Sequence, residues 1–262
     1  MSLSRELQLH ITQMQEIRSI LNAMKNLAFM EIHKLQRFKT MQGQALATIE
    51  NAALDFLDFY PRPKRCHEQP AHLCILLGAE RGFCGDFNES LLKAIASQTY
   101  TGIIAVGSRL RLEGTNLEGA NIAEEVPTII NRLLDTIGAL ADGADLTLVY
   151  HDSTHQISQL QLLPPFPLHQ QTPHKGNPPL LNLAPEDFFA NLVEHYLFAV
   201  LHEIFYISLM AENQRRLQHL EGAVKHLDDE TVNLQRKSQI YRQEEITEEI
   251  EVILLNAEIF RS

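Results

Sequence analysis

Apolar residues recur at every third or fourth position near both ends of the chain. In residues 1–60 they are Leu7, Ile11, Met14, Ile17, Leu21, Met24, Ala28, Ile32, Leu35, Phe38, Met41, Ala45, Ile49 and Ala52. In residues 186–262 the same spacing gives Leu217, Leu220, Val224, Leu227, Thr231, Leu234, Ser238 and Tyr241, in which Thr231 and Ser238 are polar. This spacing places each set on one helical face. The pattern therefore predicts two long helices that pack antiparallel on each other.

The helix breakers divide the chain in the same way. All 11 prolines lie from Pro61 to Pro185, and only Gly43 precedes this stretch while only Gly222 follows it. Because proline breaks a helix interior and glycine weakens it, both terminal segments can stay helical over their whole length. We expect an N-terminal coiled-coil helix over 1–60 and a C-terminal coiled-coil helix over 186–262.

The middle of the chain has the pattern of alternating strands and helices. The expected strands are 73–77, 103–106, 146–150 and 156–163, and the expected helices are 87–96 and 126–140. This order predicts a small, Rossmann-like, mostly parallel α/β domain over 61–163. A proline-rich connector over 164–185 would lead to the last helix. The predicted fold class is α/β plus long helices, with the α/β domain lying between the two coiled-coil helices.

Charge and cysteine content exclude several classes of protein. The formal net charge of −11 argues against a binder of nucleic acid or of an anionic membrane. Cys66, Cys74 and Cys84 lack metal-ligand spacing, which indicates reduced thiols in the cytosol. We find no apolar run of the length that a membrane span needs and no export signal at the N-terminus.

The last segment carries most of the negative charge. Residues 186–262 hold 15 acidic and seven basic side chains, concentrated in Asp228–Glu230 and Glu244–Glu251. Two interpretations remain open: a solvated acidic face, or a face that meets a basic partner.

Candidate chemistry is sparse. The glycine-rich segment Gly78–Asn88 lies where phosphate loops lie, but it matches neither nucleotide-binding fingerprint, and a tight structural turn is expected. Cys84 has no identifiable base beside it and is expected to be buried. The histidines His151, His155, His169 and His174 lack metal-ligand spacing. We therefore expect no catalytic residue, no metal and no cofactor.

Three segments resemble the gamma subunit of F-type ATP synthases, the central rotor shaft. Ile17–Ala28 is similar to the family's N-terminal I-T-K-A-M-x-M-V-A helix, and Glu80–Asn88 is similar to D-R-G-L-C-G-G-x-N. Tyr241–Ile250 is similar to N-x-x-R-Q-x-x-I-T-x-E-L, and Glu212 with Arg216 fits the upstream E-x-x-x-R. Glu80 and Asp86 replace an aspartate and a glycine of the pattern, and the connector and the acidic last helix also depart from it. The chain resembles a divergent branch of the family.

The resemblance implies a non-catalytic subunit that couples ion flow to ATP synthesis or hydrolysis by rotation. The implied contacts with the catalytic ring are Met24, Lys25, Arg216, Arg242, Gln243, Ile246, Thr247 and Glu249. The implied foot, which would engage epsilon and the c-ring, includes Glu80, Arg81, Gly82, Cys84, Gly85 and Asn88. The implied partners are the alpha, beta, delta and epsilon subunits and the c-ring, at the cytoplasmic side of the bacterial plasma membrane. The membrane would be touched only indirectly, and the coupling ion would be H⁺ or Na⁺.

Two other classes of function stay open at this point. A small α/β nucleotide-binding enzyme with helical dimerisation arms would hold its ligand at the Gly82–Gly85 turn. A coiled-coil scaffold unrelated to ATPases would show no association with an alpha/beta ring.

Overall fold

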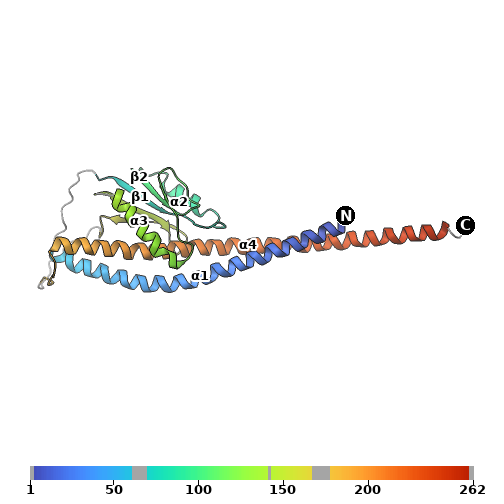
Figure 1. Ribbon diagram of the computed structural model, residues 1–262, viewed down its shortest axis with the longest axis horizontal. Coiled ribbons are helices and arrows are strands. Elements are labelled where there is room, and N and C mark those ends of the chain that lie inside the picture. Colours follow the sequence, from blue (N-terminus) through green and yellow to red (C-terminus); the bar gives the residue numbers. More distant parts are fainter. Residues whose placement is uncertain (1–2, 61–69, 141–142, 167–177, 260–262) are drawn as a thin grey trace. The chain divides into compact units, whose positions relative to one another are not determined.

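The computed structural model describes residues 3–60, 70–140, 143–166 and 178–259 (Figure 1). Its contacts divide the chain into two units, which are described separately. One unit comprises Met1–Leu27 with Leu217–Ser262, and the other comprises Ala28–Arg216. Two long helices, α1 (Leu3–Phe59) and α4 (Pro185–Ile259), contribute residues to both units.

A five-stranded sheet forms the centre of the unit Ala28–Arg216. Its strands are β1 (His72–Leu77), β2 (Gly102–Val106), β3 (Thr115–Leu117), β4 (Asp145–His151) and β5 (Ile157–Leu163). They lie in the order β3-β2-β1-β4-β5, and only β5 runs antiparallel to its neighbour. The carboxyl ends of the four parallel strands therefore share one edge of the sheet.

Helices cover both faces of this sheet. Alternate residues of β1 point to opposite sides, so neighbouring residues of this strand pack in different clusters. Ile75 packs in one cluster with α3 (Val126–Leu140) and with residues of α1 and α4. Leu76 packs in the other cluster with α2 (Phe87–Ile95). A short 3₁₀ helix, Ala123–Glu125, leads into α3. Burial on both faces explains why the central strands β1 and β2 are continuous apolar runs.

In the other unit, α1 and α4 form an antiparallel helix pair. The hydroxyl of Thr231 lies 3.9 Å from the sulfur of Met14, and Arg18 forms an ion pair with Asp228 at 2.5 Å. The apolar seam is thin: its buried members are Leu21, Leu220 and Val224, with Met24, Ala223 and Leu227 packed beside them. The predicted fold class, with long terminal helices and a mostly parallel α/β sheet, is confirmed.

The apolar stripe predicted for α1 is wrong in four places. Ile17, Met41, Ala45 and Ala52 are exposed, whereas Leu46, Ala53 and Phe56 are buried. The seam passes through Gln42 and Gly43 instead of Met41. There the side-chain amide of Gln42 donates to the carbonyl of Ala199 at 3.2 Å. A polar residue that satisfies a backbone group can replace an apolar one on the seam, and apolarity alone does not predict this.

Strand β3 was also missed by the sequence prediction. Its three residues carry no apolar run, and their pairing with β2 is set by the sheet edge rather than by local pattern. The other predicted strands and helices are present, and within the described residues their ends differ by at most two residues.

Within the described residues, α4 contains an 18-residue window with a mean hydropathy of 1.3, enough by length and composition to cross a membrane. However, 61% of that window is buried inside the protein, as in the core helix of a globular fold. The absence of a membrane span thus stays a prediction.

Candidate functional site

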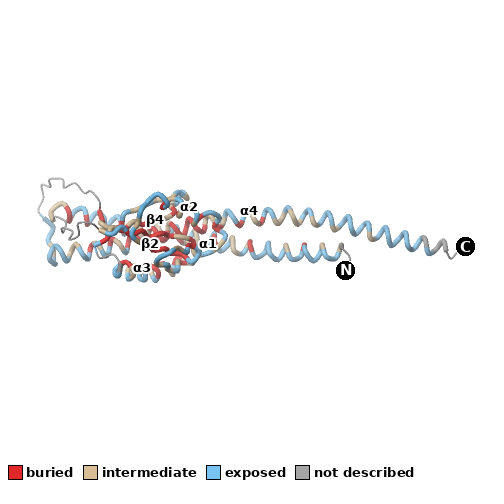
Figure 2. The backbone as a smooth tube through the Cα atoms, turned by 90° about the horizontal axis from the view of Figure 1, so that it is seen from above, coloured by how far each residue is buried: buried red, intermediate tan, exposed pale blue. Residues whose placement is uncertain are grey.

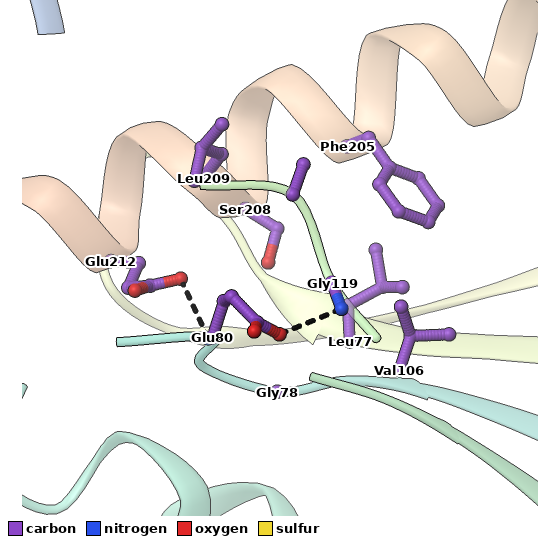
Figure 3. Close-up of a pocket in the computed structure, with 10 residues that line it drawn as sticks. Leu77, Gly78, Glu80, Val106, Gly119, Phe205, Ser208, Leu209 and Glu212 are labelled. Carbon is purple, nitrogen blue, oxygen red and sulfur yellow. Dashed lines mark hydrogen bonds between the residues drawn. The ribbon is translucent and has the colours of Figure 1, made fainter. Parts of the chain in front are cut away.

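The turn after β1 is held together by the carboxylate of Glu80. One oxygen of Glu80 accepts the backbone N–H of Ser108 at 2.8 Å and that of Gly119 at 2.7 Å. The other accepts the hydroxyl of Ser108 at 2.7 Å. Glu80 follows β1, Ser108 follows β2 and Gly119 follows β3, so one side chain joins three loops at the carboxyl edge of the sheet. Figure 3 shows the hydrogen bond between Gly119 and Glu80.

A buried ion pair on α4 anchors the same turn. Glu212 and Arg216 are each 3% exposed and are bonded to each other one helical turn apart. The Glu212 carboxylate accepts the backbone N–H groups of Glu80 at 3.3 Å and Arg81 at 3.2 Å. The Arg216 guanidinium donates to the carbonyl of Gly82 at 3.2 Å. Two ionised side chains of one helix thus satisfy both donors and acceptors of the turn, as buried charges require.

The environment sets the ionisation of these groups. Burial raises the pKa of Glu212, which the guanidinium of Arg216 and the two backbone N–H groups oppose. Burial also works to raise the pKa of Glu80, but the hydrogen bonds from Ser108 and Gly119 outweigh it and bring the pKa below its usual value. For Cys84, burial is the largest cause and the Glu212 carboxylate the second, and its pKa rises to about 12. A thiol of such high pKa is unreactive at neutral pH, as expected for a buried structural cysteine.

The backbone of the turn uses left-handed conformations at two positions. Gly85 has φ 61° and Phe83 has φ 64°, which is uncommon for a residue other than glycine. Asp86, which stands where the family pattern has a second glycine, has φ −85° and needs no glycine. The side-chain oxygen of Asn88, in the first turn of α2, accepts the backbone N–H of Ala79 at 2.9 Å.

The cavity beside this turn is too small for a nucleotide. It has a volume of about 20 Å³ and is lined by Leu77, Gly78, Glu80, Val106, Gly119, Ala120, Phe205, Ser208, Leu209 and Glu212 (Figure 3). One water molecule fits such a volume, whereas ligand pockets measure roughly 300–1,000 Å³. At the edge where sheets of this kind bind phosphates, the N–H groups of Ser108, Gly119, Glu80 and Arg81 are already bound by the chain's own carboxylates. The geometry does not favour the nucleotide-binding alternative.

The histidines do not assemble a metal centre in the described part of the chain. No three His, Cys, Asp or Glu side chains among the described residues are placed to hold a metal ion. His151 is buried, its ring centroid lies 3.9 Å from that of Phe87, and its Nε2 lies 2.9 Å from the Phe87 carbonyl. His169 and His174, like Cys66, lie outside the described residues.

Stability is expected to fall as the pH drops below about 6.5, the ordinary histidine pKa. Burial lowers the pKa values of His151 and His202 in the folded chain, so the unfolded chain takes up protons first. The stabilising contribution is complete above the unfolded pKa and is lost as the pH falls toward the folded one. Urea midpoints measured from pH 7.5 to 5 should show this slope. His151→Gln should flatten it, and His195→Gln, which removes an exposed imidazole of α4, should not.

The implied ring contacts divide into two groups in the structure. Met24 is partly buried in the α1–α4 seam, and Lys25 beside it is half-buried. Five residues lie exposed on α4 beyond the seam: Arg242, Gln243, Ile246, Thr247 and Glu249. Arg216 differs from both groups because it lies in the interior of the unit Ala28–Arg216, bonded to Glu212. As contacts with a partner, all of these residues stay predictions.

Sequence reasoning did not assign the residues that complete the turn. Glu212 entered only as a match to a family pattern, and Ser108 and Gly119 were not assigned. Gly119 follows the undetected strand β3, so its place beside Glu80 was not predictable from local pattern. The one usable signal was the i, i+4 spacing of Glu212 and Arg216 within an otherwise apolar helix, because a charged pair there has to be buried together.

Comparison with known proteins identifies relatives along nearly the whole chain. A family model described as ATP synthase matches residues 4–258. The ATP synthase gamma chain of Clostridium perfringens is 25% identical over 279 residues, covering 97% of this chain and 96% of the relative. The ATP synthase gamma chain of Clostridium botulinum is 26% identical over 211 residues, covering 72% of this chain and 73% of the relative.

Solved structures share the fold. A chain in the Euglena gracilis mitochondrial ATP synthase (OSCP/F1/c-ring, rotational state 3) superposes with a TM-score of 0.71 at 14% identity, covering 98% of this chain and 94% of that one. A chain in the rotor of the same enzyme gives a TM-score of 0.66 at 13% identity, covering 93% and 98%. At such identities the likeness concerns the fold, and the resemblance found in the sequence is confirmed by the family match.

Proposed function

This chain belongs to the ATP synthase gamma-chain family, and on that premise we propose that it is the central-stalk subunit of a rotary F-type ATP synthase or ATPase. In this role it couples ion flow through the membrane sector to ATP synthesis or hydrolysis in a ring of alpha and beta subunits. Its helix pair turns inside the ring and presents a different face to each catalytic subunit. Differential contact energy of this kind is what biases one subunit toward one conformation and its neighbour toward another.

The observation that carries the proposal is the helix pair of residues 3–27 and 217–259. Its seam buries only a few apolar side chains, and several others stay exposed on its outer surface, among them Leu9, Ile17, Ile20 and Leu27 at 48–61%. Scattered exposed apolar residues without one dominant patch suit a surface that contacts a partner and still turns against it. A permanent interface would be larger and more continuously apolar.

The proposal assigns no chemistry to this chain. The carboxylates of Glu80 and Glu212 accept hydrogen bonds from the N–H groups at the sheet edge. The adjacent cavity of about 20 Å³ is too small for a substrate. The ATP-dependent steps would then belong to the alpha and beta subunits.

The residues that we propose to contact the catalytic ring are mainly side chains of α4 that lie exposed. Arg242, Gln243, Ile246, Thr247 and Glu249 would transmit torque to the catalytic ring, with Met24 and Lys25 supporting them from α1. The domain organisation that we propose is the one expected from the sequence: a coiled coil of 1–60 and 186–262, an α/β domain over 61–163 and a connector over 164–185. That domain would form the foot, with the Glu80–Asn88 turn joining it to α4.

The proposed setting is a complex associated with the membrane. The chain would assemble with alpha, beta, delta and epsilon subunits and with a c-ring that spans the membrane. Its own position would be peripheral, at the cytoplasmic side of a bacterial plasma membrane. The net charge of −11 agrees with this indirect attachment, because anionic headgroups repel it.

We expect Arg242→Ala combined with Gln243→Ala to lower ATP turnover of the assembled complex by roughly fivefold, the lower end of a typical coupling free energy. Both side chains are exposed, so the isolated chain should stay folded. The measurement is steady-state ATP hydrolysis after reconstitution with the alpha/beta ring. Gln235→Ala with Arg236→Ala, one heptad earlier on the same helix, is the matched control and should have a smaller effect. Turnover equal to wild type in the first variant would remove both residues from the proposed contact set.

A further inference from the structure

The end of α4 projects beyond its partner helix. Met14 faces Thr231 and Arg18 faces Asp228, so in an antiparallel pair Leu3 lies level with about residue 243. Within the described residues, α1 therefore offers no apolar face to α4 beyond that point. Residues 246–254 are exposed helix on every side (Figure 2).

This uncovered segment is amphipathic. Ile246, Ile250 and Ile253 follow one another at steps of four and three, which places them on one helical face. They are 47%, 51% and 65% exposed. Three aligned isoleucines on a solvated helix are unfavourable, because each one exposes apolar surface to water. The face is therefore suited to a partner.

The same segment is strongly acidic around the isoleucines. Residues 242–254 contain five glutamates and only Arg242 as a basic side chain. Two pairs of these glutamates, Glu244–Glu248 and Glu245–Glu249, are four residues apart, where like charges destabilise a helix. Each pair costs stability in the isolated chain, and a positively charged partner surface would relieve that repulsion.

We propose that this segment, Arg242–Leu254, docks on a wall of the catalytic ring that carries Lys and Arg side chains around an apolar patch. The inference rests on the proposed function and adds the chemistry of the partner. The isoleucines fill the apolar patch, and the glutamates pair with the basic side chains at its rim. Rim pairs of this kind steer association and fix orientation more than they add affinity. They also let the shaft turn, because partly solvated ion pairs are weak and exchange easily.

Charge complementarity favours this partner over three other classes of surface. Five clustered glutamates are repelled by the phosphates of a nucleic acid and by the headgroups of an anionic membrane. A purely apolar wall would leave the glutamates desolvated without a partner, which is costly. A basic wall with an apolar centre is the surface that satisfies both features of the segment.

The test measures binding of the full chain to the alpha/beta ring of its own complex at several salt concentrations from about 0.05 to 0.3 M, where screening changes most. The test variant is Glu244→Gln with Glu245→Gln and Glu248→Gln. Wild-type affinity should fall as salt rises. The variant should bind about tenfold more weakly at low salt and should depend less on salt. These nearly isosteric changes lie at two exposed positions and one half-buried position, and they should leave folding intact.

Two further variants separate charge from apolar contact. Glu221→Gln with Asp229→Asn and Glu230→Gln removes three charges from the paired part of α4 and should bind like wild type. Ile250→Ala with Ile253→Ala should weaken binding while keeping the salt dependence of the wild-type chain.

The outcomes distinguish this inference from the proposed function. If the wild-type chain does not bind the ring at all, the proposed function fails. If wild type binds and the glutamate variant binds equally well with the same salt dependence, the function stands and the basic wall is wrong. Tighter binding by the glutamate variant would show an acidic or purely apolar wall and would also overturn the inference.

Discussion

Replacing Arg216 with alanine is expected to lower the free energy of unfolding by about 3–5 kcal/mol, the usual cost of breaking a buried ion pair from one side. The guanidinium is 3% exposed and bonds to Glu212, to the carbonyl of Gly82 and, at 2.8 Å, to the side chain of Asn213. Without it, the Glu212 carboxylate stays buried without a cation, with two backbone N–H groups and the Cys84 thiol as its remaining partners. Urea denaturation followed by tyrosine fluorescence measures the loss, since the chain has six Tyr and no Trp.

The neighbouring arginine provides the control. Arg215 pairs with Asp86 at 3.3 Å, and their side chains are 33% and 60% exposed. Arg215→Ala should therefore cost no more than about 1 kcal/mol. Equal losses in the two variants would contradict the role given to the buried pair. Glu212→Gln should cost less than Arg216→Ala, because the amide keeps one oxygen for the backbone N–H of Glu80 or of Arg81, which bond to different oxygens of Glu212.

Gly107→Ala is expected to destabilise the chain by about 3 kcal/mol or more, because backbone strain and a steric clash act together. Gly107 has φ 121°, which side chains rarely allow. A Cβ atom there would lie 2.7 Å from the carbonyl oxygen of Gly78 and 2.8 Å from its carbon. Neither atom can move without displacing the end of β1 and the turn that follows it. A lower urea midpoint with an unchanged slope would be the measured sign.

Gly138→Ala is the matched substitution with the opposite sign. Gly138 lies inside α3, and a Cβ atom there would meet nothing within 4 Å. Alanine should stabilise this helix by up to about 1 kcal/mol. If both glycine variants lost stability to the same extent, the close approach of Gly107 to Gly78 would not be the cause.

The parts of the fold that follow from local pattern were predictable from the sequence. Buried parallel strands such as β1 are continuous apolar runs. A helix as long as α1 needs a segment with few helix breakers, and α1 contains no proline and Gly43 as its one glycine. The seam of α1 near Met41 was not predictable, because Gln42 is placed there by a hydrogen bond to a residue of α4. Long-range partners of this kind are invisible to a periodicity argument.

The candidate site was predictable only in its position. Glycine spacing and the strand before it indicated a turn over Gly78–Asn88. The role of Glu80 as an internal anion depends on Ser108 and Gly119, two residues that the sheet brings together from separate loops. Glu212 and Arg216 were noted only as a match to the family pattern, and the contact of Arg216 with Gly82 depends on how α4 packs on the sheet.

The antiparallel pairing of α1 and α4 constrains how such chains can change length. One inserted residue rotates everything beyond it by about 100°, which would turn Leu21 or Leu220 out of its seam. An insertion of seven residues restores the face, but in one helix alone it displaces every later contact by two turns. Insertions and deletions in these helices should therefore occur in pairs of seven residues, one in α1 and one in α4. Homologous sequences can be searched for that coupled pattern.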